Sequence, residues 1–132
     1  MSISDPRHRA ADFDEWIAAE FAERGAFTVL VVLVDIDETR VTPLSSTFFH
    51  VIGDEIDWSE IGILFGSSGA DWDGASFFPA TASDGLPLDN SAARQELRKL
   101  KQRLDDDRLV LNEGYFFDKW GRQMKVEEIS LQ

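Results

Sequence analysis

The sequence contains no cysteine and only two histidines, His8 and His50, among its 132 residues. The absence of cysteine excludes disulfides, thiolate catalysis and cysteine-based zinc sites, and two imidazoles are too few for a multi-histidine metal site. No apolar run approaches the roughly 18 residues that a membrane span requires. The N-terminus also lacks the apolar core of a signal peptide. These absences predict a cytoplasmic protein that does not bind membranes.

Basic residues are scarce in the middle of the chain. Residues 26–92 contain eleven acidic side chains and Arg40 as the only base, and the whole chain has a net charge of −12. Such a field repels phosphates, so we expect no direct binding to nucleic acid. It attracts cations and basic protein surfaces, although an acidic surface also serves solubility alone.

The bases gather instead in a later segment, which contains Arg94, Arg98, Lys99, Lys101 and Arg103. One interpretation is a site for an anion or a partner on the outer face of a helix. The other is a solvated face that neutralises the acidic middle segment through space, because individual surface ion pairs contribute little. The pattern leaves both open.

The apolar content of 43% and the charged content of 29% are typical of one globular domain with its own core. We expect residues 1–10 to form a flexible N-terminal lead-in and residues 11–132 to form a single globular domain. The core is expected to be rich in aromatic side chains, since the chain contains ten Phe and four Trp.

Hydrophobic periodicity predicts the main elements. The nearly continuous β-branched run at 27–35 indicates a central strand buried on both faces. Apolar residues at helical spacing predict two helices, at about 13–24 and 91–105. Further strands are expected at 47–52, 75–79, 108–111, 115–118 and 123–129, while 59–65 fits either a strand or a short turn of helix. Short connections favour antiparallel neighbours, so the fold class is α+β, with a mostly antiparallel sheet.

Two carboxylates follow the central strand in Val34-Asp35-Ile36-Asp37-Glu38-Thr39. This run resembles the first motif of the haloacid dehalogenase superfamily, a strand that ends in Asp-x-Asp-x-Thr. The resemblance implies a doubly wound sheet and magnesium-dependent phosphoryl transfer, with Asp35 as the nucleophile and Asp37 as the general acid/base. Thr39 would position the backbone. The alternative without a catalytic role is a buried strand that ends in two solvated carboxylates.

A magnesium ion at this position would need more ligands, and the candidate set is Asp35, Asp37, Asp54 and Asp57. The last two come only about fifteen residues later, without an intervening helix. We therefore expect neither a cofactor nor a metal in the leading interpretation, and Mg²⁺ only in the alternative one.

Tryptophan beside carboxylates is the clearest non-catalytic signal. Trp72 lies between Asp71 and Asp73 in a loop, where complete burial is harder to arrange than on a strand, and Trp58 follows Asp57. Aromatic side chains are enriched as anchors in protein interfaces. We therefore predict a partner-binding site at Trp72, Asp71, Asp73, Trp58 and Asp57. The Phe pairs at 48–49, 77–78 and 116–117 either form an exposed apolar patch or lie inside a sheet covered on both faces.

The leading functional hypothesis is a small acidic domain without catalytic activity that binds a protein with a basic surface or associates with itself as a homodimer. The first alternative is a magnesium-dependent phosphatase or phosphotransferase that uses Asp35 and Asp37. The second alternative is a nucleic-acid mimic that blocks a basic protein, which would require the carboxylates of residues 35–89 to lie along one elongated face.

Overall fold

The fold is described by a computed structural model for residues 12–38, 40–53, 55–66 and 71–124. Five strands form one sheet in the order β2-β1-β3-β4-β5, and all neighbouring strands are antiparallel. The predicted α+β class with an antiparallel sheet is confirmed. The elements in chain order are α1 (Asp12–Arg24), β1 (Phe27–Ile36), β2 (Val41–Val51), α2 (Trp58–Gly66), β3 (Gly74–Ala80), α3 (Asn90–Asp106), the 3-10 helix η2 (Arg108–Glu113), β4 (Tyr115–Asp118) and β5 (Gln123–Met124).

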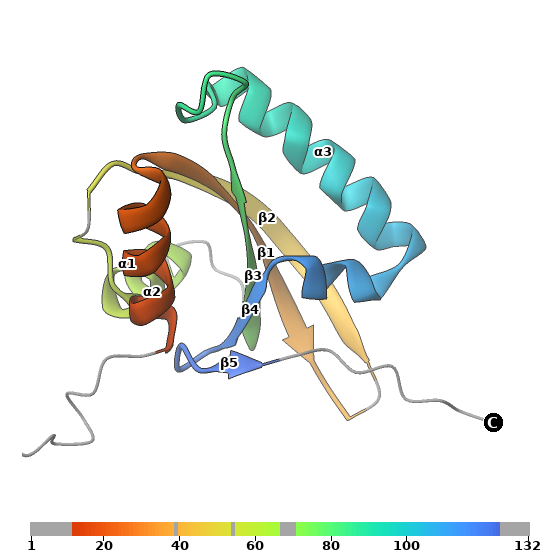
Figure 1. The fold of residues 1–132 in the computed structure, drawn as a ribbon. Coiled ribbons are helices and arrows are strands. Elements are labelled where there is room, and N and C mark those ends of the chain that lie inside the picture. The colour runs from red at the N-terminus through yellow and green to blue at the C-terminus, as the bar shows by residue number, and fades with distance from the viewer. Residues whose placement is uncertain (1–11, 39, 54, 67–70, 125–132) are drawn as a thin grey trace, which may run out of the picture.

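Strand β1 is buried on both faces, as its β-branched run predicts. Because side chains alternate across a strand, one set points to the layer of α1 and α2 and the other to the layer of α3 and η2 (Figure 1). The first set is Phe27, Val29, Val31 and Leu33, and the second is Leu30, Val32 and Val34. The sheet therefore has a separate apolar core on each side.

The Phe pairs are divided between these two cores. Phe77 and Phe117 pack on the α1 and α2 side, while Phe78 and Phe116 pack on the α3 side. The Phe pairs therefore do not form an exposed apolar patch, because they lie inside a sheet that is covered on both faces. These Phe side chains contribute to the interior.

Strand β2 is longer than the predicted strand at 47–52, because it begins at Val41. Pro43 lies within this strand and does not break it. Strand β2 lies at the edge of the sheet, where a residue without an N–H is tolerated when its nitrogen faces away from the ladder. A register shift opposite Leu33 and Val34 accommodates the local irregularity.

Two other segments differ in type or extent. The predicted strand at 108–111 is wrong, since η2 occupies this segment, with the Asp107 carboxylate accepting a hydrogen bond from the N–H of Leu109 at 3.0 Å. The ambiguous segment at 59–65 belongs to helix α2. Of the expected strand at 123–129, only β5 lies within the described residues.

The two predicted helices are confirmed within about one residue at each end. Gly25, at φ 73°, ends α1 in the left-handed conformation that glycine adopts without steric cost. The carboxylate of Asp89 caps α3 by accepting a hydrogen bond from the N–H of Ala92 at 2.7 Å. The expected lead-in at 1–10 lies outside the described residues. Within the ranges that the structure describes, no helix has the length and apolar composition needed to cross a bilayer.

Candidate interaction surface around helix α2

Two carboxylates hold the N-terminus of α2. Asp57 Oδ1 accepts a hydrogen bond from the N–H of Glu60 at 3.0 Å, and Asp14 Oδ1 accepts one from the N–H of Trp58 at 2.7 Å. These bonds satisfy N–H groups that have no partner inside the helix, and the negative charge complements the helix dipole. Asp57, which the sequence suggested as a partner or metal residue, therefore has a structural role as a helix cap.

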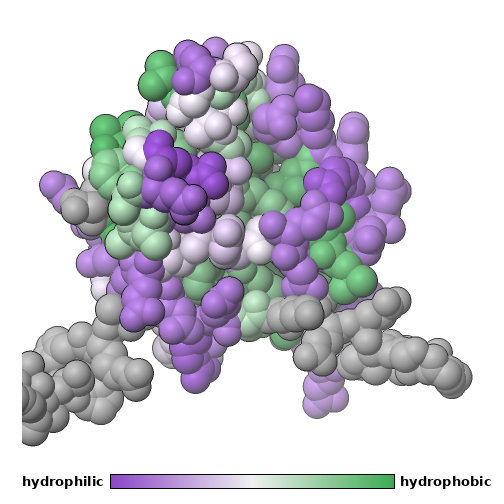
Figure 2. Space-filling view, viewed as in Figure 1, coloured by the Kyte–Doolittle hydropathy of each residue, from purple (hydrophilic) through white to green (hydrophobic). Residues whose placement is uncertain are grey.

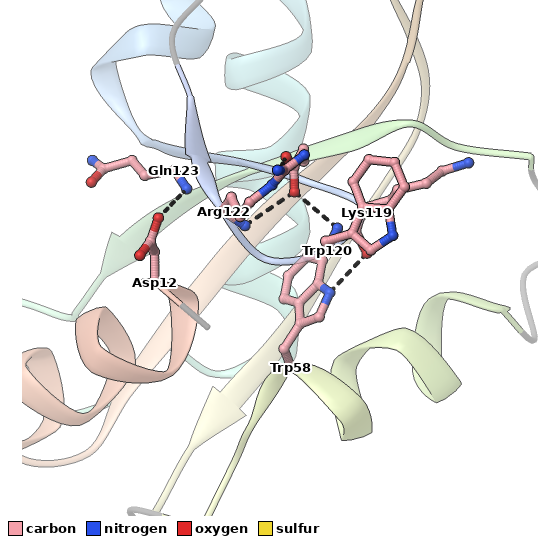
Figure 3. Close-up of polar contacts among 7 residues, drawn as sticks. Asp12, Trp58, Lys119, Trp120, Arg122 and Gln123 are labelled. Atoms are coloured by element: carbon pink, nitrogen blue, oxygen red, sulfur yellow. Dashed lines mark hydrogen bonds and ion pairs between the residues drawn. The ribbon is translucent and has the colours of Figure 1, made fainter. Parts of the chain in front are cut away.

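The sequence-predicted Trp58, which is the first residue of α2, is in contact with Trp72. Their ring centroids are 5.9 Å apart, and the ring of Trp72 also contacts the buried Phe65 at 5.5 Å. Trp58 Nε1 donates a hydrogen bond to the carbonyl of Lys119 at 2.9 Å (Figure 3). Both tryptophans are half-buried. They form the outer border of the aromatic core, with one edge toward solvent.

The outer side of α2 exposes two large aliphatic residues that sequence reasoning missed. Ile63 is 76% exposed and Leu64 is 48% exposed, whereas Ile61 and Phe65 pack into the core. Glu60 is also exposed on this helix. The available signal was that this segment contains more apolar residues than one buried helical stripe requires. The run at 59–65 fits a strand as well as a helix, so its apolar spacing alone does not identify which side chains are exposed.

Trp120 is the most exposed tryptophan, at 64%. It lies in a turn closed by Asp118, whose carboxylate accepts hydrogen bonds from the N–H groups of Trp120 and Arg122 (Figure 3). Its ring is flanked by cations, with Arg122 Cζ 5.1 Å and Lys119 Nζ 5.9 Å from the centroid. Its surroundings are therefore basic, unlike those of Trp72.

Asp35 and Asp73 form an acidic pair at the end of β1. Asp73 Oδ2 accepts a hydrogen bond from the N–H of Ile36 at 2.8 Å, and Lys119 Nζ lies 3.7 Å from Asp73 Oδ1. The bond from Ile36 lowers the pKa of Asp73. A side-chain hydrogen bond with Asp73 raises the pKa of Asp35, and the charges of Asp73, Asp37 and Asp71 raise it further. The structure thus brings several predicted residues together here.

The remaining candidate metal residues that the structure describes do not join Asp35 and Asp73. Asp37 lies in the turn between β1 and β2, where Asp37 Oδ1 accepts a hydrogen bond from the N–H of Arg40 at 2.9 Å. Asp57 caps α2, and Thr39 and Asp54 lie outside the described residues. Throughout the described ranges, no three His, Asp or Glu residues are arranged to hold a metal ion. The antiparallel sheet also differs from the doubly wound sheet that the dehalogenase resemblance implies.

The acidic residues of the middle segment are divided between the two ends of the sheet. Asp35 and Asp73 lie where β1 ends, whereas Asp84 and Asp89 lie in the connection between β3 and α3. The N–H of Leu88, in that connection, bonds to Thr28 near the start of β1 at 2.9 Å. This division does not favour the single elongated acidic face that a nucleic-acid mimic would require.

Comparison of the chain with protein-family models, with curated proteins and with solved structures found no match. We define the α2 surface as the exposed aliphatic residues Ile63 and Leu64 together with the exposed carboxylates Asp57, Glu60 and Asp71. The contact between Trp72 and Phe65 places the segment that contains Asp71 beside α2.

Proposed function

We propose that this protein is a protein-binding domain that uses its α2 surface to dock a partner with basic and apolar side chains. The observation that carries the proposal is the exposure of Ile63 and Leu64 beside Asp57, Glu60 and Asp71. Single exposed apolar residues are ordinary on protein surfaces. Two adjacent exposed aliphatic residues provide an apolar centre, and the carboxylates of the same surface provide the charged rim that interfaces share.

The aliphatic residues and the carboxylates of the α2 surface contribute to binding in different ways. Covering a Leu or Ile side chain completely contributes roughly 1.5–3 kcal/mol, so the two aliphatic residues supply most of the affinity. The carboxylates act mainly on orientation and association rate, because rim charges steer an approaching partner.

The charge of the α2 surface selects a basic partner rather than a second copy of the chain. Neither 55–66 nor 71–73 contains a base, and the net charge of −12 makes two copies repel each other. In the described part of the chain, helices cover both faces of the sheet. A homodimer through an open apolar sheet face is therefore not favoured.

The experiment uses a fluorescently labelled amphipathic helical peptide of Lys and Leu as the probe. Anisotropy titrations compare the parent protein with the double variant Ile63→Ser, Leu64→Ser. The matched control is Leu86→Ser, since Leu86 is 60% exposed and lies in the loop before α3. We expect the double variant to lose about tenfold or more in affinity and the control to lose less than about twofold.

Circular dichroism verifies that all three proteins are folded. Equal affinities for the parent and the double variant would overturn the proposal, because charge alone would then explain binding. Sedimentation that shows a homodimer dissociated by the double variant would overturn it in favour of a second copy. The proposal would be supported if higher salt weakens peptide binding and the double variant still binds more weakly than the parent at that salt.

A further inference from the structure

The outer edge of β2 presents a row of backbone groups without a strand partner in the described part of the chain. Strand β2 is the first strand in the sheet order and pairs with β1 alone. The carbonyl of Val34 accepts a hydrogen bond from the N–H of Asp73 at 2.8 Å, so the backbone of Val34 faces β3 rather than β2. Antiparallel ladders alternate along the strand. The outward N–H and C=O groups of β2 therefore belong to Ser46, Phe48 and His50.

Within the residues that the structure describes, this edge lacks the protection that edge strands usually have. Natural edges are shortened, bulged or given charges that prevent pairing with another chain. Strand β2 has 11 residues, none of them Asp, Glu, Lys or Arg, and its proline and register shift lie toward its N-terminal end. The stretch Ser45–Val51 is therefore open to strand pairing.

A groove runs beside this edge, between β2 and the C-terminal half of α3. Its volume is about 260 Å³. Val32 and Leu104 contribute apolar atoms to it, Pro43 and Ser46 lie on the β2 side, and Lys101 lies on the helix side. Asp105 and Arg108 also line it. The groove thus has room for side chains that project from an added strand.

The flank of α3 beside the groove carries bases that have no carboxylate partner. Arg94 and Arg98 precede Lys101 by seven and three residues, a spacing that places all three on one side of a helix. None of them forms an ion pair with a described carboxylate. The bases of the opposite flank are paired, Lys99 with Glu96 and Arg103 with Glu113. Hydrophilic side chains follow the course of α3 in Figure 2.

We propose that the free edge of β2 binds an extended acidic segment of a partner protein, which adds to the sheet as a sixth strand. Backbone hydrogen bonds to Ser46, Phe48 and His50 supply affinity, and the bases Arg94, Arg98 and Lys101 select acidic side chains. Alternate residues of a strand lie about 7 Å apart, and the helix from Arg94 to Lys101 spans about 10 Å. Two successive carboxylates on one face of the added strand therefore meet this flank. The α2 surface lies on the other side of the sheet with the opposite charge, so this proposal does not depend on it.

The first test uses a labelled eight-residue peptide of alternating Glu and Val, with alternating Lys and Val as the peptide control. Lys101→Glu and Lys99→Glu are a matched pair, since both side chains are exposed lysines of α3 on opposite flanks. We expect the parent to bind the acidic peptide, and we expect Lys101→Glu not to weaken any binding of the basic peptide, which the α2 surface can also bind. Lys101→Glu should weaken binding about tenfold, and Lys99→Glu by less than about twofold. Equal losses in the two variants would overturn the proposal, because binding would then follow net charge alone.

The second test measures hydrogen exchange at individual backbone amides of β2. Amide hydrogen exchange on adding the acidic peptide should slow at Ser46, Phe48 and His50, and should stay unchanged at Thr47 and Phe49, which already bond to β1. Ser46→Pro removes an outward N–H and should weaken binding about tenfold while circular dichroism stays unchanged. Uniform protection along β2 would overturn strand addition. A peptide-free dimer in sedimentation that Ser46→Pro dissociates would overturn the acidic partner in favour of a second copy.

Discussion

Asp35 and Asp73 interact through their side chains at the place where β1 ends and β3 begins. The two carboxyls are 38 positions apart in the sequence and come together because Val34 pairs with Gly74 across the sheet. The N–H of Ile36 stabilises the charge of Asp73, whereas Asp35 faces negative neighbours. As the pH falls, Asp35 is therefore the first of the two to take up a proton.

Asp35→Asn should stabilise the protein at neutral pH. The pKa of Asp35 in the folded protein is raised from its ordinary value of 3.8. Above the raised pKa, the ionised carboxylate therefore destabilises the fold, whereas below pH 3.8 it has no such effect. We expect the Tm difference between Asp35→Asn and the parent to grow as the pH rises through the region just above 3.8. Thermal unfolding at several pH values measures it. The charge-matched control is Asp84→Asn, which removes one carboxylate from the loop before α3. The same pH dependence in both variants would contradict the role of Asp35.

Magnesium should not raise the Tm of the parent protein. The Asp73 carboxylate already accepts a bond from Ile36 N–H, Asp37 accepts one from Arg40 N–H, and no described group of three carboxylates could hold the ion. Thermal unfolding with and without Mg²⁺, together with a phosphatase assay, measures this. A magnesium-dependent stabilisation that disappears in Asp35→Asn would contradict us and support the phosphoryl-transfer hypothesis.

Thr28→Val should destabilise the fold by about 2 kcal/mol, because it removes a buried hydroxyl that serves two partners. Thr28 Oγ1 accepts a hydrogen bond from the N–H of Leu88 at 2.9 Å and lies 2.9 Å from His50 Nδ1. Urea unfolding gives the free energy. Thr28→Ser retains the hydroxyl and should recover most of the loss. A loss in Thr28→Val no larger than that in Thr28→Ser, which keeps the hydroxyl and loses the methyl, would show that the two hydrogen bonds contribute little.

Gly114→Ala should destabilise the protein by about 1–3 kcal/mol. A Cβ at this position would lie 2.6 Å from the carbonyl oxygen of Phe77 and 2.9 Å from the ring of Phe78. Gly62→Ala is the matched control, because a Cβ there meets nothing within 4 Å and alanine favours helix. The control should be neutral or slightly stabilised in the same unfolding experiment. A neutral Gly114→Ala would show that β3 and the start of β4 move apart easily.

The helices and the central strand could be predicted because their signals are local. The apolar spacing in α1 and α3 and the β-branched run of β1 contain the information about which faces are buried. The segment of η2 could not be assigned in this way, since a short apolar run fits a strand and a 3-10 helix equally well. Its conformation depends on the Asp107 cap and on packing against the sheet.

The candidate site was predictable only in part. The proximity of Trp to Asp in the sequence drew attention to Trp58 and Trp72, which contact each other in the fold. Their role in binding a partner stays a prediction. The sequence could not show that Ile63 and Leu64 are exposed, because that depends on which side of α2 packs against β3 and α1. Nor could it show that Asp57 caps a helix.

The sequence by itself determined the acidic surface charge, the absence of cysteine chemistry and a central strand that must be covered on both faces. Only the tertiary structure decided that Asp35 meets Asp73, that β2 is an edge, and that the unpaired bases of α3 lie beside that edge. The physical reason is that charge and hydrophobic period belong to single segments. Strand order, register and the side of a helix that stays exposed result from how all segments share one core.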